Sequence, residues 1–475
     1  MSDPLSDLSA AMAAENLLAV SQAARALVAE SPALAGRWSE VAAAALTAGD
    51  ELTALAAARK LTQSAPDHAA SWLWVASVHM ALDQPGEALG VMEAAARRLP
   101  REGAIHRRMG RALAELNQRE RAQTCFRTAL SLDHNDALAW EGLAQAKTFS
   151  RGDDDLAAME QVRIGWNEQT PARTRGVLSY AIAKAYEDTG EYEAAGRRVA
   201  EGAAFFRETA PFDVDGHEAG VAHVLKVYDS RFAEVNEEAG VLDARPVMIF
   251  APPRAGAPWL SRVLSAPDGA AGLGRRNALF WASSSPLGDH RPEDLLRAFQ
   301  EGGANILSRV GRTYLDRLGE QAGREAKRVV DPSSLLEIAG GAAGLCLPAA
   351  KFVRITRTPR DAAWSIYKHR FAQGRHWSYH PDDIARVLAA HNRLCERWEA
   401  LFGERMMTVA YEDLAADPKG EAARIAAFAG VDADAAGVEA WLTAERLQAD
   451  PVGVHERGGS RFEAVDAALQ RAGLI

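Results

Sequence analysis

A 34-residue interval recurs through the first part of the chain and constrains its fold more than any other feature. The large ring-bearing residues of this interval are Trp38, Trp72, His106 and Trp140, and the residues that end each unit are Pro32, Pro66, Pro100 and His134. A small residue follows each large one four positions later: Ala42, Ala76, Gly110 and Ala144. Small residues let paired helices approach closely, and proline ends a helix because it cannot continue one. The interval therefore predicts stacked helix–turn–helix units.

The pattern resembles the tetratricopeptide repeat (TPR), a helix pair of this length. A further unit is recognisable in residues 179–203, after the stretch 148–156, which we expect to be a loop. We predict about five repeats forming a solenoid over residues 1–205; the alternative is an unrelated alanine-rich helical bundle. Such solenoids bind peptides or proteins on their concave face, so we expect a protein or peptide partner there.

The second half of the chain alternates short apolar runs with helical patterns. The runs cover residues 246–250, 328–331, 351–356 and 405–411. Alternation of this kind predicts an α/β domain with a mostly parallel sheet, which we place at residues 244–475 behind a helical connector at 206–243. Ligands of parallel sheets bind at the carboxyl ends of the strands. The first three runs lead there into APPRAGAP, DPSS and RTPRD.

The loop after the first run, residues 251–258, connects a strand to a helix, as anion-binding loops do. Arg254 and Gly256 suit an anion. No residue of the turn offers a hydroxyl, however, and Pro258 also lacks an N–H group. An ordinary turn is the alternative for this loop.

The stretch after the third run is the clearest candidate for a phosphate site. Arg357 ends the run, Pro359 and Asp361 suit the first turn of a helix, and Ser365 follows two turns into that helix. A guanidinium fork and a hydroxyl can approach one anion from these places. The alternative is that Arg357 pairs with a carboxylate and Ser365 has no ligand.

Composition limits the partners. The formal net charge of −10 over 475 residues argues against nucleic acid or an anionic membrane as the main partner, since both need a basic surface. We find no apolar stretch long enough to span a membrane, no metal-ligand spacing among the three cysteines, and no G-x-x-x-x-G-K-[ST] motif of a kinase-like nucleotide enzyme. We expect a cytoplasmic protein without a metal; its oligomeric state is not indicated.

Together these stretches resemble sulfotransferases that use phosphoadenosine phosphosulfate (PAPS), and more closely the bacterial family that joins TPR units to a sulfotransferase domain. The matching stretches are Ala251–Trp259, Arg357 with Pro359-Arg360-Asp361 and Ser365, and Tyr411-Glu412-Asp413-Leu414 with Asp417-Pro418. The resemblance implies a P-loop-like α/β fold with a parallel sheet. It also implies PAPS, or its product adenosine 3′,5′-bisphosphate (PAP), as the cofactor. The cofactor-binding residues would be Arg254, Gly256, Arg357 and Ser365.

The chain departs from that family where the chemistry is done. Loop hydroxyls become Ala255, Ala257 and Pro258, Arg275 stands where the family has a catalytic Glu, and Pro332 replaces a Lys. A guanidinium cannot serve as a general base. Replacement bases would be Glu293, His290 or His376, although nothing in the sequence positions them. Two hypotheses follow: an active sulfotransferase whose acceptor the repeats recruit, or a degenerate one that serves as a nucleotide- or protein-binding scaffold.

A final segment, residues 454–470, stands where the family has a Gly/Arg lid near the nucleotide. Arg457 and Arg461 would then cover the phosphates; the alternative that we favour is that both are solvated surface residues.

Overall fold

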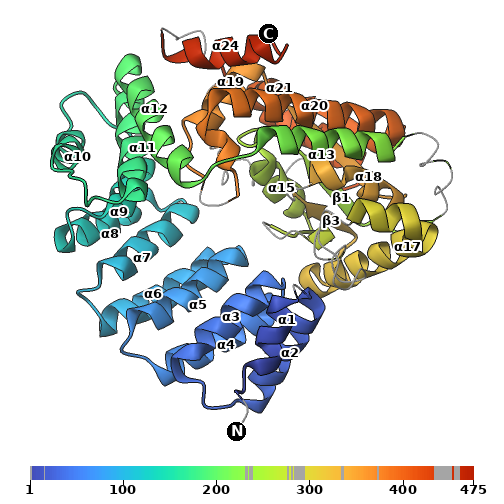
Figure 1. Cartoon of the computed structure of the whole chain (residues 1–475), viewed down its shortest axis with the longest axis horizontal. Helices are drawn as coiled ribbons and strands as arrows, with labels where there is room; N and C mark the ends of the chain where they lie inside the picture. The colour runs from blue at the N-terminus through green and yellow to red at the C-terminus, as the bar shows by residue number, and fades with distance from the viewer. Residues whose placement is uncertain are drawn as a thin grey trace.

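A computed structural model describes residues 3–475 except for 15, 230–233, 235–238, 275–277, 280–281, 283–294, 333–335, 372–373, 433–451 and 454–459. Its first half is a curved stack of helix pairs (Figure 1). The helices are α1 (Ser6–Ala13), α2 (Leu17–Glu30), η1 (Ala35–Arg37), α3 (Trp38–Thr47), α4 (Glu51–Ser64), α5 (Ala69–Ala81), α6 (Pro85–Arg98), α7 (Gly103–Glu115), α8 (Arg119–Leu132), α9 (Ala137–Ala146), α10 (Asp154–Ile164), α11 (Ala172–Asp188) and α12 (Tyr192–Thr209).

The same contact recurs in successive repeats. A ring nitrogen of the large residue lies close to the main-chain oxygen six positions earlier, at 2.7 Å for Trp72 and Pro66, 2.9 Å for His106 and Pro100, and 2.9 Å for Trp140 and His134. This confirms the predicted register of a helical repeat region.

The small residues of the repeat let paired helices approach closely, as predicted. A Cβ atom built on Gly110 would lie 2.8 Å from the ring of Phe126, so only glycine lets α7 approach α8 this closely. The stretch 148–156 is only partly a loop, because its last three residues already belong to α10. Asp153 caps this helix by accepting a hydrogen bond from the main-chain nitrogen of Asp155, as an aspartate before a helix often does.

The second half contains a parallel five-stranded sheet with the order β2-β3-β1-β4-β5, in agreement with the predicted fold class. The strands are β1 (Pro246–Phe250), β2 (Ala270–Gly272), β3 (Arg328–Asp331), β4 (Lys351–Thr356) and β5 (Met406–Ala410). β2 is absent from the sequence prediction. It is a three-residue edge strand of alanine and glycine, and these residues have little preference for strands.

Helices cover both faces of the sheet. α15 (Ala257–Ser265) and α22 (Pro418–Ala429) pack on one face. On the other lie α13 (Val214–Val227), α17 (Leu295–Ala322), α18 (Leu336–Cys346) and α20 (Pro381–Phe402). The remaining elements are α19 (Pro359–Tyr367), η3 (His376–Tyr379), η4 (Gly403–Arg405), α21 (Tyr411–Ala416), η6 (Ser460–Phe462) and α24 (Glu463–Arg471).

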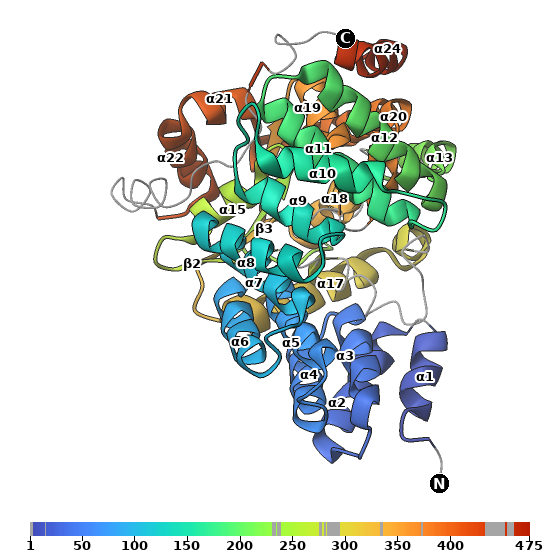
Figure 2. The same cartoon turned by 90° about the vertical axis from the view of Figure 1, so that its left-hand side faces the viewer.

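One of the hydrophobic clusters contains residues of both the solenoid and the α/β domain. Trp364 of α19 and Phe462 of η6 belong to the same buried cluster as the last repeats, and Phe206 of α12 stacks on Tyr379 with 4.8 Å between ring centroids. At the other end of the solenoid, Arg317 of α17 donates a hydrogen bond to the main-chain oxygen of Gly49. The repeats therefore curve round one side of the α/β domain (Figures 1 and 2). Among the described helices, none is both long and apolar enough to cross a membrane.

Candidate functional site

The carboxyl ends of β3, β1 and β4 meet at one edge of the sheet, because these strands are adjacent and parallel. β1 lies between strands that follow it later in the chain, and ligands of parallel sheets bind where the strand order changes direction in this way. The loops after β1 and β4 are described in full, and both carry residues that the sequence analysis selected.

The loop after β1 is sharply folded. Arg254 has φ 70° and Gly256 has φ 85°, so two of three successive residues lie in the left-handed region. For a side-chain-bearing residue such as Arg254, this conformation costs about 1 kcal/mol. Gly256 avoids this cost and stands directly before α15, where it has no side chain of its own to cap the helix. Backbone strain of this kind concentrates at ligand sites.

Arg357 fixes this loop from β4. Its Nη1 atom donates a 2.6 Å hydrogen bond to the main-chain oxygen of Arg254, and its guanidinium carbon lies 4.4 Å from the centroid of the Tyr411 ring. Glu412 accepts hydrogen bonds from both the main-chain nitrogen (2.9 Å) and the hydroxyl (2.8 Å) of Thr358. The Tyr-Glu-Asp stretch thus holds the turn after β4, a role that the sequence did not reveal.

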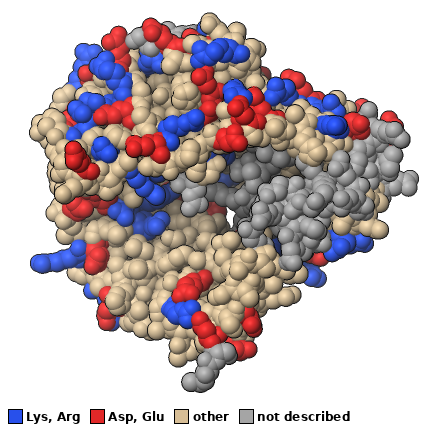
Figure 3. Space-filling model, viewed as in Figure 1, with Lys and Arg blue, Asp and Glu red and all other residues tan. Residues whose placement is uncertain are grey.

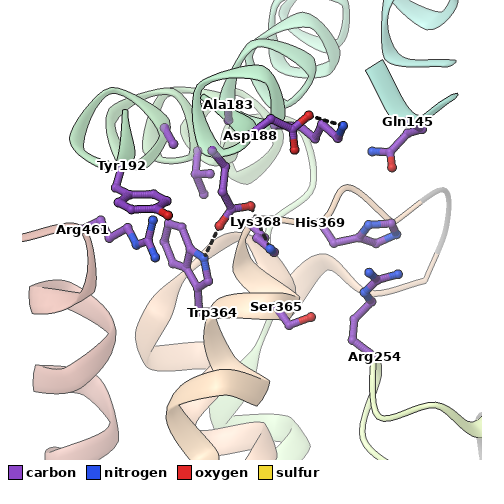
Figure 4. Close-up of a pocket in the computed structure, with 14 residues that line it drawn as sticks. Gln145, Ala183, Asp188, Tyr192, Arg254, Trp364, Ser365, Lys368, His369 and Arg461 are labelled. Atoms are coloured by element: carbon purple, nitrogen blue, oxygen red, sulfur yellow. Dashed lines mark hydrogen bonds and ion pairs between the residues drawn. The ribbon is translucent and has the colours of Figure 1, made fainter. Parts of the chain in front are cut away.

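α19 begins at Pro359, where the sequence predicted a helix start. Asp361 is buried in its first turn and accepts a 2.7 Å hydrogen bond from the main-chain nitrogen of Gly453. Ser365 follows one turn later and is also buried, with 1% of its surface exposed. The buried serine faces a pocket that opens between α19 and the solenoid (Figure 4).

This pocket has a volume of about 360 Å³ and is walled by both halves of the chain. Its lining residues are Gln145, Ala183, Lys184, Glu187, Asp188, Tyr192, Ala195 and Val199 from the solenoid, and Arg254, Trp364, Ser365, Lys368, His369 and Arg461 from the α/β domain. Of the four predicted cofactor-binding residues, Arg254 and Ser365 line the pocket. Gly256 and Arg357 stand behind it, in and beneath the loop that carries Arg254.

Glu187 joins the two walls of the pocket. Its carboxylate accepts a 3.2 Å hydrogen bond from Nε1 of Trp364 and a 2.8 Å hydrogen bond from Nζ of Lys368. Lys184, one turn earlier on α11, donates to Asp188. Burial lowers the pKa of Lys184, and the neighbouring Asp188 carboxylate offsets part of that shift.

The lining carries more positive than negative charge. Four fixed cations, from two lysines and two arginines, face two carboxylates, and His369 adds a titratable ring next to Arg254 (Figure 4). A partly enclosed site with this excess favours an anion, because charges inside it are screened less than on the surface. The pocket can therefore hold a phosphate-bearing ligand.

The burial of Arg461 differs most clearly from what the sequence led us to expect. We favoured a solvated surface residue, but only 7% of its surface is exposed. Its guanidinium carbon lies 4.0 Å from the ring centroid of Tyr192 and 5.4 Å from that of Trp364. The favoured alternative was therefore wrong for Arg461, since a single sequence does not show that α12 covers this residue. Arg457 lies outside the described residues.

The positions proposed for chemistry are only partly described. Arg275, His290 and Glu293 lie outside the described residues. Pro332 follows β3, where the buried Asp331 accepts a 3.1 Å hydrogen bond from the Tyr314 hydroxyl. His376 is exposed at the start of η3 and does not line the pocket.

Most residues of the pocket wall were not predicted from the sequence. Lys368 and His369 stand three and four residues beyond Ser365, the last residue selected in this stretch, and could have been included on position alone. The solenoid residues gave no such signal, because nothing in the sequence shows which repeat faces the α/β domain.

Comparisons with known proteins agree with this architecture. Residues 246–435 match the model of a family described as the sulfotransferase family. No curated protein matches the chain.

Solved structures give distant matches. A sulfotransferase from Alicyclobacillus acidocaldarius is 22% identical over 48% of this chain and 95% of its own, with a TM-score of 0.30. The sulfotransferase domain of the Synechococcus PCC 7002 olefin synthase is 21% identical over 50% of this chain and 90% of its own, with a TM-score of 0.31. MamA is 17% identical over 35% of this chain and 95% of its own, with a TM-score of 0.28. At these scores the superpositions carry no argument about function, and the family match concerns residues 246–435 alone.

Proposed function

Since residues 246–435 carry a sulfotransferase-family domain, we propose that the chain transfers a sulfuryl group from PAPS to a hydroxyl acceptor. One observation supports this most. Arg254 and Ser365 come from neighbouring strand–loop–helix elements and line the same cationic pocket. A guanidinium and a hydroxyl that converge in this way suit a phosphate group.

The proposed roles follow from position. Arg254 and Ser365 contact phosphate oxygens of the nucleotide, and Gly256 lets the main chain approach them closely. Arg357 keeps the loop in place through its bond to the Arg254 carbonyl and adds positive charge below it. PAPS would supply the sulfuryl group: a bond from sulfur to the acceptor oxygen would form as the bond from sulfur to the 5′-phosphate oxygen breaks, PAP would leave, and the acceptor's proton would pass to water.

The repeats would present the acceptor, which we propose to be a peptide, a protein or a small molecule. Part of the concave face is already used, because Glu141 of α9 accepts two 2.6 Å hydrogen bonds from Arg370, and Glu187 of α11 holds α19. Apart from the contacts at Gly49 and Asp83, the repeats before α9 remain for the acceptor. We keep the cytoplasm as the proposed compartment on the sequence grounds given above.

A degenerate sulfotransferase that only binds a nucleotide or a protein is the second candidate, and the first turn of α15 favours it. Pro258 is the second residue of this helix and has no N–H group, and Ala255 and Ala257 offer no hydroxyl. Losing one preorganised donor costs a transferase about 10²- to 10³-fold in rate.

Calorimetric titration with PAP tests nucleotide binding directly. We expect the full chain to bind PAP, and Arg357→Ala to weaken that binding. If no binding is detected at millimolar PAP, neither candidate function retains its nucleotide site.

Transfer of radiolabelled sulfate to any acceptor would rule out the degenerate enzyme. For that enzyme, Pro258→Thr combined with Arg275→Glu is expected to tighten PAP binding or restore turnover.

A further inference from the structure

An arginine cluster on α7 occupies the part of the solenoid that spans the carboxyl edge of the sheet. On one side of α7, the turn between α5 and α6 touches the loop after β2: a Cβ atom built on Gly274 would lie 3.2 Å from the Cβ atom of Asp83. On the other side, α9 contributes Gln145 to the pocket. α7 therefore bridges the space between these two contacts.

The repeat register shows which face of α7 looks toward the α/β domain. Arg107 stands 34 residues before Glu141, which pairs with Arg370 of that domain. Arg111 stands 34 residues before Gln145, which lines the pocket. Equivalent repeat positions point the same way, so Arg107 and Arg111 face the α/β domain too. Figure 3 shows Lys and Arg side chains gathered over α7 at the edge of the hollow.

Arg108 is the most unusual member of the cluster. Burial lowers its pKa, and the neighbouring Arg111 and Arg107 guanidinium groups lower it further. Within the part of the chain that the structure describes, the side chains of Arg108 and Arg111 form no hydrogen bond or ion pair, whereas Arg107 pairs with Asp136. Glu115 is the only carboxylate on α7 and lies at its end. The guanidinium of Arg108 is partly buried, and the exposed guanidinium of Arg111 lies beside it, so an anion between the two is favoured.

We propose that Arg108 and Arg111 bind a carboxylate of an extended acidic peptide, and that this peptide is the acceptor of the transfer reaction. The identification as acceptor rests on the proposed function; the peptide site itself does not. A peptide suits this place because a solenoid's concave face accommodates extended chains, and guanidinium forks match carboxylates.

The repeat spacing also sets a register for the peptide. Neighbouring helices pack about 10 Å apart, so Arg111 lies about that far from Gln145 at the pocket. An extended chain advances about 3.3 Å per residue. The acidic residue therefore stands about three positions from the hydroxyl that is to be modified.

Fluorescence anisotropy tests the site without an assay of turnover. The probe is a labelled peptide with a glutamate three positions from a single tyrosine, compared with the same peptide carrying glutamine. We expect the full chain to bind the glutamate peptide at least tenfold more tightly, less so at high salt. The double variant Arg108→Gln/Arg111→Gln removes this preference. Arg97→Gln/Arg101→Gln removes two exposed arginines at the end of α6 and in the turn before α7 as the matched control, and should leave the preference intact.

The proposal would be overturned if the two peptides bind equally tightly. It would also be overturned if the two double variants lose the preference for the glutamate peptide to the same extent. Tighter binding of a single-stranded oligonucleotide at the same arginines would also overturn it, in favour of a different polyanion. PAP titration of the α7 variant separates this inference from the proposed function, since PAP affinity should be unchanged. Peptide binding without any PAP binding would support the site on α7 and contradict the transferase.

Discussion

Arg357 donates a 2.6 Å hydrogen bond to the main-chain oxygen of Arg254, and this bond connects the end of β4 to the strained loop after β1. The two residues are 103 positions apart in the chain. One arginine thus holds the backbone of the other, whose side chain lines the pocket. The site depends on the two strands being neighbours.

Replacing Arg357 by alanine should weaken PAP binding at least tenfold, because the loop loses its support and the site loses a charge. A hydrogen bond from a charged group contributes about 1.5–3 kcal/mol, so the free energy of unfolding should also fall. Arg405 is a matched control: it also donates to main-chain oxygens and lies over aromatic rings, but it does not line the pocket. Arg405→Ala should lower stability and leave PAP affinity unchanged, as measured by denaturant unfolding and calorimetry.

Ser365→Ala should lower PAP affinity by about tenfold or more, which corresponds to the loss of one hydrogen bond to a charged phosphate. Calorimetric titration provides the measurement. Ser179→Ala is the control, since Ser179 is fully buried on α11 and lies outside the pocket. Equal affinities for the Ser365 variant and the unaltered protein would show that this hydroxyl does not contact the nucleotide.

Glu187→Gln should weaken both the joint between the halves and the pocket. Glutamine has one acceptor oxygen and no charge, so it cannot accept from both Trp364 and Lys368. We expect the free energy of unfolding to fall by about 1–3 kcal/mol, and PAP affinity to change as Lys368 is released. Glu141→Gln breaks a comparable contact, to Arg370, away from the pocket. If the two substitutions change PAP affinity equally, Glu187 and the pocket wall that it holds do not take part in nucleotide binding.

His391 should make stability depend on pH. Burial, and secondarily the Arg354 guanidinium, lower its pKa to about 4, whereas an unfolded chain keeps a value of about 6.5. Below about pH 6.5 the unfolded state binds the proton first, so the free energy of unfolding falls by about 1.4 kcal/mol per pH unit until about pH 4. Above that range both states are neutral and this contribution is constant.

The contribution of His391 is measured by comparing the free energy of unfolding of the unaltered protein and of His391→Gln over a series of pH values, because other titrating groups contribute equally to both. The variant should show a shallower fall in stability between about pH 6.5 and about pH 4. Parallel curves would mean that His391 titrates normally in the folded protein.

The sequence predicted most of the fold because the fold is built from local patterns. Large ring-bearing residues every 34 positions indicated the helix pairs, and compact apolar runs indicated four of the five strands. The exception, β2, has no apolar side chain larger than alanine and exists because β3 pairs with it.

The candidate site was less accessible from the sequence. Arg254 and Ser365 stand out because each follows a strand in a recognisable motif. Glu187 and Trp364 do not, since they are 177 positions apart and meet only after the solenoid has curved back onto α19. Arg461 was misplaced for the same reason: its burial depends on α12, which nothing in its own surroundings reveals.

Hydrogen exchange with and without PAP tests the central claim most directly, namely that the pocket between solenoid and α/β domain is the nucleotide site. We predict that PAP slows amide exchange in the Arg254–Trp259 loop, in α19 around Ser365, and also in α11 around Glu187. Protection confined to other segments, or no protection at saturating PAP, would contradict it.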